Sequence, residues 1–135
     1  MQLAAAQYTE VDAKLIPTGR LLPVKDTALD FSTFTRLGAR AGALGPKHIY
    51  DHNFVLDRKA GDTGLLKAAV VREAKTGRTL ETWTTEPGVQ VYTSPLDGSA
   101  AKGQFGFFCL ETQHFPDSPN KPNFPSPVLK AGAEF

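Results

Sequence analysis

Three segments of the sequence carry polar side chains in positions where they could bind or transform a small molecule. The first, FGFFCLETQ (105–113), ends with a carboxylate, Glu111, after a run of large apolar residues. In a strand, Glu111 and Gln113 would share one face, because side chains alternate. If that face lined a cleft, it would present two polar groups on a rigid apolar floor, which is typical of a small-molecule site. Alternatively, Glu111 lies at a sheet edge in contact with water, because carboxylates are rarely buried.

The second segment is YDHNFVLD (50–57), in which Asp51, His52 and Asn53 precede an apolar run. Asp51 could accept a hydrogen bond from a ligand hydroxyl group. The simpler interpretation is an Asx-type turn before a strand, because Asp and Asn are good turn formers. His52 would then be a loop histidine with an ordinary hydrogen-bond partner.

The third segment is EPGVQVYT (86–93), in which Pro87-Gly88 marks a turn. In the strand that follows, Gln90 and Tyr92 share one face, and both side chains can hydrogen bond to sugar-like hydroxyl groups. The alternative is that this face of a half-buried strand is only in contact with solvent.

Other common kinds of site find little support in the sequence. His48, His52 and His114 show no paired metal-binding spacing. Cys109 is the only cysteine, so it can form neither a zinc site nor an internal disulfide. No dinucleotide, P-loop or GxSxG motif is present. We therefore expect no metal and no cofactor.

Length and composition indicate a globular protein. The 135 residues suit one domain, residues 1–135, and contents of 41% hydrophobic and 21% charged residues argue against disorder. A net charge of +1 without a long run of like charge indicates neither a nucleic-acid partner nor a membrane-surface partner. No apolar run is long enough to span a membrane, and the N-terminus does not resemble a signal peptide. We expect a reducing, cytoplasmic location.

The elements that must position the polar side chains are predicted to be strands. Short apolar runs are separated by 12 Gly and 10 Pro residues, which is an all-β rhythm. Residues 67–86 predict a β-hairpin with a turn at 75–77, because apolar, β-branched and aromatic residues flank a Lys-Thr-Gly sequence. Residues 89–93 and 105–113 predict two further strands.

Three segments are less regular. Residues 15–24 predict two short extended pieces around a Thr-Gly turn, and two prolines keep them out of a sheet interior. Residues 29–40 predict a strand followed by a helical turn. The five prolines after Phe115 predict an extended, irregular wrap with at most a last edge strand.

Four segments, taken in order, resemble the C-terminal half of the galactose mutarotase (aldose 1-epimerase) family. They are YTEVDAKLIPTGRLLPV, YDHNFVLD, GRTLETWTTEPGVQVYTS and CLETQHFPDSPNKPNFPSPVLKAG, and the resemblance runs from about Tyr8 to Gly132. Because four motifs occur in the same order, the resemblance is specific.

This resemblance implies a fold, an activity and three site residues. The fold is a large antiparallel β-sandwich. The activity is the interconversion of the α and β anomers of free hexoses such as galactose and glucose, without metal or cofactor. By resemblance, Glu111 of CLETQ is the general base, Asp51 of DHNF binds a sugar hydroxyl group, and Gln90 of EPGVQ lies against the sugar.

An ionised glutamate suits this reaction. The anomeric hydroxyl group loses a proton while the ring oxygen gains one. The C1–O5 bond then opens to give the aldehyde, the C1–C2 bond rotates, and the ring closes on its other face. Partial burial of Glu111 beside Phe107 and Phe108 would make it a stronger proton acceptor, and the same carboxylate can return the proton.

The sequence also departs from the family pattern. A complete family member is considerably longer, and its general acid is a histidine in the N-terminal half, whose motifs do not occur here. The three histidines of this chain lie in segments that match other parts of the family, so none replaces that acid. Loss of an acid–base partner costs about 10²- to 10⁴-fold in rate, so we expect impaired activity. Ser94-Pro95 replaces the family's Gly-Asn and predicts an altered cleft wall.

Two alternatives remain open. The chain could be a non-catalytic carbohydrate-binding β-sandwich that keeps Asp51, Gln90 and Glu111 as ligand groups, or a remnant that neither binds nor catalyses. Half a sandwich exposes apolar surface and unpaired sheet edges. We therefore expect either an N-terminal half supplied by another chain or self-association through these edges.

Overall fold

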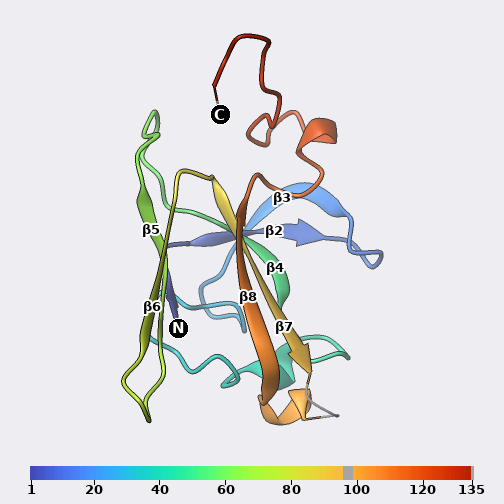
Figure 1. The fold of residues 1–135 in the computed structure, drawn as a ribbon. Helices are drawn as coiled ribbons and strands as arrows, with labels where there is room; N and C mark the ends of the chain where they lie inside the picture. The colour runs from blue at the N-terminus through green and yellow to red at the C-terminus, as the bar shows by residue number, and fades with distance from the viewer. Residues whose placement is uncertain (96–98, 135) are drawn as a thin grey trace.

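The described residues form two antiparallel sheets (Figure 1). The computed structural model describes residues 1–95 and 99–134. The three-stranded sheet has the order β1-β5-β6, formed by Gln2–Leu3, Leu66–Arg72 and Thr79–Thr84. The five-stranded sheet has the order β3-β2-β4-β7-β8, formed by Pro17–Pro23, Gln7–Val11, Asp51–Val55, Gly88–Pro95 and Phe105–Gln113. The short 3₁₀ helices η1, η2 and η3 span Ala41–Ala43, Ala100–Lys102 and Ser118–Asn120. The all-β, antiparallel prediction is confirmed.

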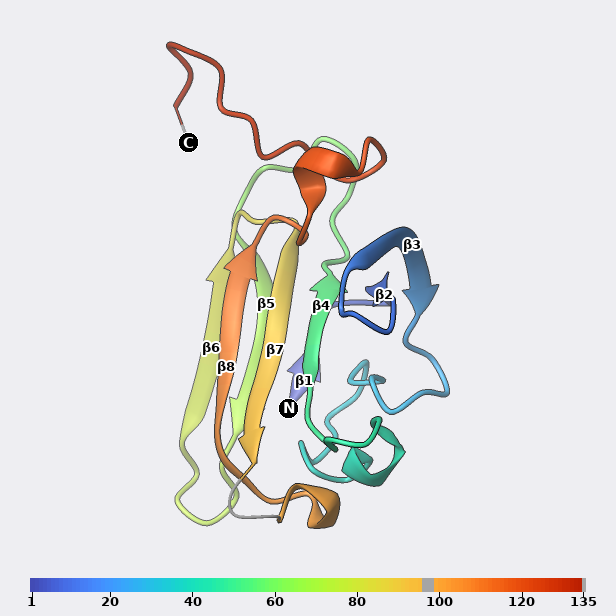
Figure 2. The same ribbon diagram turned by 90° about the vertical axis from the view of Figure 1, so that its right-hand side faces the viewer.

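The three-stranded sheet lies behind one face of the five-stranded sheet, and the core fills the space between them (Figure 2). Phe54, Val89 and Val91 project from β4 and β7 into this core and are fully buried. Ala68 and Ala69 of β5 belong to the same buried cluster, and their small side chains allow the two sheets to approach. Because side chains alternate along a strand, the opposite, outer face of β4 and β7 points away from the core.

The predicted strands in the second half of the chain are confirmed. Strands β5 and β6 form the expected hairpin, which Glu73 and Arg78 close with a 2.9 Å backbone hydrogen bond. Gly77 in this turn has a φ of 75°, a left-handed conformation that glycine adopts without strain. Strand β7 contains the expected residues 89–93, and β8 has the predicted bounds.

The prediction for residues 15–24 is wrong in one respect. The Thr-Gly sequence does not reverse the chain, because Gly19, at a φ of 93°, lies within the continuous strand β3. The reversal lies earlier, where Asp12 N donates to the carbonyl oxygen of Ile16 at 2.9 Å. Strand β3 is nevertheless at the edge of its sheet, the position that its prolines indicated.

The strand predicted within residues 29–40 does not form. Leu29 and Phe31 are buried in the core, but successive turns shape the backbone before them, closed by hydrogen bonds from Thr27 N to Val24 O and from Asp30 N to Thr27 O. The apolar pattern therefore reflects anchoring of a loop and not strand pairing. A short helical turn, η1, follows this segment.

The proline-rich tail is an irregular wrap, as predicted, and contains no edge strand among its described residues. The rings of Phe115 and Phe124 pack edge to face with centroids 5.2 Å apart, and both side chains are buried. Asn123 Nδ2 donates to the carbonyl oxygen of Gly19 at 2.8 Å, which attaches the tail to β3. The tail then extends beyond the sheets toward the C-terminus (Figure 1).

Large apolar side chains remain exposed on edge strands. Phe107 on β8 is 55% exposed, and Leu80 and Trp83 on β6 are about half exposed. These positions fit the prediction of association through sheet edges, which stays a prediction. Within the described residues, no helix has the length and apolar character needed to cross a membrane.

Candidate active site

The sheet register brings the three predicted site residues onto adjacent strands of one face. Gln90 in β7 is the Cα partner of Glu111 in β8. On its other side, Gln90 pairs with Asn53 in β4, two residues from Asp51. Gln90 Nε2 donates a 2.7 Å hydrogen bond to Asp51 Oδ1. Residues directly opposite each other in an antiparallel pair point to the same side, so all these side chains lie on the outer face.

Asp51 is a strand residue, so the Asx-turn interpretation is wrong. Strand β4 begins at Asp51, which pairs with Tyr92 of β7. The carboxylate accepts from the Gln90 amide, and a hydrogen bond to an ionised acceptor is stronger than one between neutral groups. This bond holds the Gln90 amide in one orientation. His52 accordingly lies in the strand and not in a loop.

Glu111 is exposed, so the expected partial burial is wrong. Strand β8 is the edge strand of the five-stranded sheet, and its outer face meets solvent at Glu111. The sequence-based alternative, an edge carboxylate in contact with water, describes its exposure correctly. The register still places Glu111 directly opposite Gln90, and Cβ atoms of such pairs lie about 4.5–5.5 Å apart. The face prediction for β8 is thus confirmed.

Two cavities lie beside Asp51. The larger, with a volume of about 370 Å³, is within the range of small-ligand pockets and is lined in part by Lys47, His48 and His52. The smaller has a volume of about 100 Å³ and is lined in part by Gln90. The β2–β3 hairpin contributes wall residues to both cavities, and Glu111 lines neither.

Burial controls the protonation of His52, which follows Asp51 in the chain. Burial lowers the pKa of His52, and the Asp51 carboxylate partly offsets this effect. A neutral imidazole is therefore expected at pH 7. Its ring contacts Tyr8 in an edge arrangement with centroids 6.1 Å apart.

An aromatic pair continues the outer face beyond Gln90. The rings of Tyr92 and Phe107 are tilted, with centroids 6.2 Å apart, and both residues lie on the face of Gln90 and Glu111. Strand β7 ends at Ser94-Pro95 with an irregularity in its pairing to β8. The short connection that follows includes residues 96–98, which lie outside the described residues, so the altered cleft wall stays a prediction.

Several positioning residues were not found from the sequence. The Arg58 guanidinium donates to the carbonyl oxygens of Thr84, Gly64 and Glu86, which fixes the connection between β6 and β7. His114 Nδ1 lies 2.8 Å from Glu86 Oε2, which ties the end of β8 to that same connection. No local motif predicts these contacts, because all except the Arg58–Gly64 bond join residues at least 26 positions apart in the sequence.

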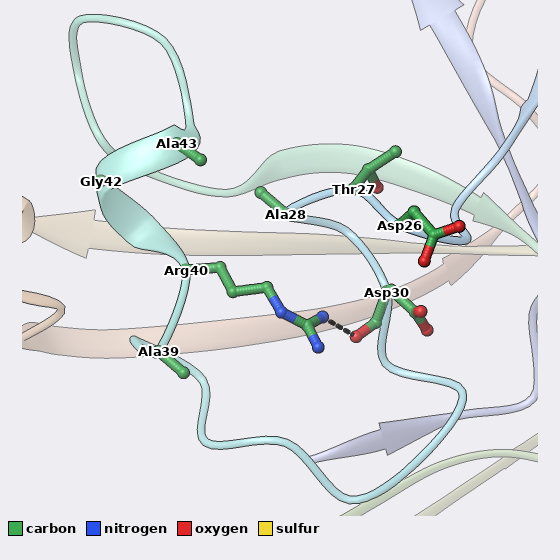
Figure 3. Close-up of a pocket in the computed structure, with 8 residues that line it drawn as sticks. All are labelled: Asp26, Thr27, Ala28, Asp30, Ala39, Arg40, Gly42 and Ala43. Carbon is green, nitrogen blue, oxygen red and sulfur yellow. Dashed lines mark hydrogen bonds between the residues drawn. The ribbon is translucent and has the colours of Figure 1, made fainter.

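The described residues contain no group of three or more His, Cys, Asp or Glu side chains arranged to hold a metal ion. A larger hollow of about 610 Å³ lies between η1 and the segment before it (Figure 3). Its lining includes Asp26 and Asp30, and the Arg40 guanidinium reaches across it to donate to the Asp30 carbonyl oxygen. None of the predicted site residues lines this hollow.

The fold is that of an antiparallel β-sheet protein, and the group of polar side chains on adjacent strands is a candidate small-molecule site on its outer face. The family model for aldose 1-epimerase matches residues 1–135, and the chain belongs to this family. It is 42% identical to galactose mutarotase from Mus musculus and 40% identical to that from Homo sapiens, in each case over 98% of this chain and 40% of the relative. It is 32% identical to aldose 1-epimerase from Escherichia coli, over 100% of this chain and 42% of the relative.

A solved structure shares the fold. The crystal structure of a GalM/aldose epimerase homologue from C. elegans matches with a TM-score of 0.79 and 26% identity, over 98% of this chain and 41% of that chain. The resemblance to the family is confirmed. The chain spans about 40% of the length of the curated relatives it matches.

Proposed function

We propose that this chain carries the base and two sugar contacts of an aldose 1-epimerase acting on free hexoses. The supporting observation is the 2.7 Å hydrogen bond between Gln90 Nε2 and Asp51 Oδ1, with Glu111 in register on the neighbouring strand. Three polar groups on adjacent strands of a rigid sheet, one of which, Asp51, lines a pocket of about 370 Å³, suit a polyhydroxylated ligand.

In this proposal Glu111 removes the proton from the anomeric hydroxyl group, and the ring oxygen receives a proton from an acid. The C1–O5 bond breaks, the aldehyde forms, and rotation about C1–C2 exposes the other face to ring closure. On ring closure the O5 hydroxyl group attacks C1 and returns its proton to the acid, while Glu111 returns its proton to the new anomeric oxygen. Asp51 and Gln90 hold the sugar hydroxyl groups, and the Asp51–Gln90 bond fixes which amide group faces the ligand.

The acid is proposed to come from an N-terminal half of the family type, supplied by another polypeptide segment. His48 and His52 lie near Asp51, but each is already engaged. His48 Nδ1 lies 3.3 Å from the Ala41 carbonyl oxygen. Burial lowers the pKa of His52, so at pH 7 it is a neutral imidazole, which is a far weaker acid than an imidazolium. Catalysis by Glu111 alone would be about 10²- to 10⁴-fold slower than with both partners.

The experiment is polarimetry of α-D-galactose with the 135-residue protein and with its Glu111→Gln variant, each at high protein concentration. We expect slow anomer exchange above the buffer rate for the wild type and none for the variant. Equal rates for the two proteins would contradict the role of Glu111. Turnover as fast as that of a full-length relative would show that the acid lies in this chain.

A second candidate function is carbohydrate binding without catalysis. The exposure of Glu111, and its absence from the lining of both cavities, favours this function. It predicts calorimetric binding of D-galactose that Asp51→Asn weakens, with anomer exchange at the buffer rate for the wild type and for Glu111→Gln. If D-galactose does not bind at all, both candidate functions are contradicted.

A further inference from the structure

Asn53 has no hydrogen-bond partner for its side chain, although it is only 2% exposed. Both Oδ1 and Nδ2 are buried and unpaired, and the neighbouring Gln90 Oε1 is buried and unpaired as well. Most buried polar atoms in folded proteins are paired, because an unpaired one loses its hydration without compensation. The Asn53 side chain therefore makes no hydrogen bond that would stabilise the fold.

These unpaired atoms belong to residues that line the same small cavity. Its polar floor is formed by Asp51, Asn53 and Gln90, and its walls include Val11 and Pro116. The volume of about 100 Å³ corresponds to a few water molecules, each of which occupies about 30 Å³ in the liquid. The cavity is thus too small for a whole sugar ring but large enough for one hydroxyl-bearing arm of a sugar.

Gly88 provides the space that the Asn53 amide occupies. A Cβ atom built at Gly88 would lie 2.7 Å from Asn53 Oδ1 and 3.0 Å from the Phe115 ring. Any side chain at this position would displace the amide. The end torsion of an Asn side chain is soft, so the amide can turn toward a group that enters the cavity.

We propose that Asn53 is a further sugar-binding residue, whose amide and Gln90 Oε1 together hydrogen bond one hydroxyl group seated in the small cavity. The proposal rests on the proposed function, because it adds a contact to the same site. One hydroxyl group can accept from Asn53 Nδ2 while donating to Gln90 Oε1, so it pairs two of the three unpaired atoms at once.

The first test compares Asn53→Leu with Thr93→Val by thermal unfolding and D-galactose calorimetry. Thr93 is the matched control, since it is buried on the core face of the same sheet and its Oγ1 is paired with Tyr50 N at 2.9 Å. Asn53→Leu should leave the Tm unchanged or raise it, while weakening galactose binding about tenfold. Thr93→Val should lower the Tm and leave the affinity unchanged. A lower Tm with unchanged affinity for Asn53→Leu would overturn the proposal.

The second test separates a lost hydrogen bond from simple blocking of the cavity. The affinities of the monodeoxy-D-galactose series are measured for the wild type and for Asn53→Ala, which opens the cavity. One deoxy sugar should bind the wild type about tenfold more weakly than galactose but should bind the variant as well as galactose does. Equal losses in both proteins for every deoxy sugar would overturn the proposal and leave the proposed function intact. Failure of the wild type to bind galactose would instead overturn both.

Discussion

The two faces of the β4–β7 pair differ in how fully their side chains are satisfied. On the core face, Phe54, Val89 and Val91 are completely buried in apolar surroundings, and the buried Thr93 has a partner. On the outer face, Asn53 and Gln90 keep unpaired polar atoms. The core face of these two strands thus stabilises the fold. The outer face instead carries unpaired polar groups, which lower stability but are suited to a ligand. Substitutions on the two faces should therefore separate folding from binding.

The largest effect is expected on the core face. Phe54→Ala should lower the free energy of unfolding by about 3–5 kcal/mol, because it removes a fully buried ring and leaves a cavity between the sheets. Urea unfolding followed by fluorescence measures this change. A loss below about 1 kcal/mol would mean that the two sheets do not share one tightly packed core.

The strands show why part of this architecture was predictable. In β7 buried and less buried side chains alternate, and β8 begins with a run of large apolar residues, so the sequence indicated both strands. The geometry of a strand then indicated the face of Glu111. The predictions for residues 15–24 and 29–40 were wrong for different reasons. Gly19 permits a left-handed residue inside a strand. Phe31 is buried in a loop that forms no strand, although its carbonyl oxygen accepts a 2.9 Å hydrogen bond from Leu3 N of β1.

In the candidate site, too, some features could be predicted from the sequence and others could not. The family motifs pointed to Asp51, Gln90 and Glu111, and the register places them on adjacent strands. Asn53 was read as a turn former, because its unpaired amide can be recognised only when burial and partners are known. The exposure of Glu111 depends on β8 being an edge strand, which no local pattern reveals.

The next largest effect is expected for Glu111→Gln on the outer face. Whatever catalysis the chain supports should fall by about 10²- to 10⁴-fold, because an amide cannot accept the anomeric proton. The free energy of unfolding should change by less than about 0.5 kcal/mol, since the side chain is exposed. Polarimetry and urea unfolding of the same preparation check both values. A stability loss comparable to that of Phe54→Ala would place Glu111 among the structural residues.

Asp51→Asn should have an intermediate effect on binding. Removing the charge weakens the hydrogen bond from Gln90 Nε2 and the grip on the sugar, so galactose affinity should fall about tenfold. Asp26→Asn is the matched control, because Asp26 lines the hollow of Figure 3 and its left-handed backbone, with a φ of 63°, accepts Asn well. An equal loss of affinity in the two variants would point to net charge and not to the site.

A smaller effect is expected from the titration of His52. Burial lowers its pKa in the folded protein, so the unfolded chain binds the proton more readily. Stability should therefore be complete above the unfolded value of about pH 6.5 and decline as the pH falls below it. His52→Phe keeps a ring against Tyr8 and should make the fall in Tm between pH 7 and pH 5 shallower. Identical slopes in the two proteins would contradict the buried, neutral state.

The smallest effect is expected on the exposed surface of the three-stranded sheet. Lys67 Nζ lies 2.7 Å from Glu81 Oε1 and 4.9 Å from the centre of the Trp83 ring. Because the ion pair is well exposed, Lys67→Met should change the free energy of unfolding by less than about 1 kcal/mol. It should leave galactose binding unchanged in calorimetry. A loss of sugar affinity in this variant would contradict the placement of the sugar site on the five-stranded sheet alone.

Chemical-shift mapping by NMR during titration with D-galactose tests the central claim most directly. The account predicts that the largest changes fall on the backbone amides of Asp51, Gln90 and Glu111 and on the side-chain amide of Gln90, all on the outer face of β4, β7 and β8. Changes confined to the hollow around Arg40, or the absence of saturable changes on these three strands, would contradict it.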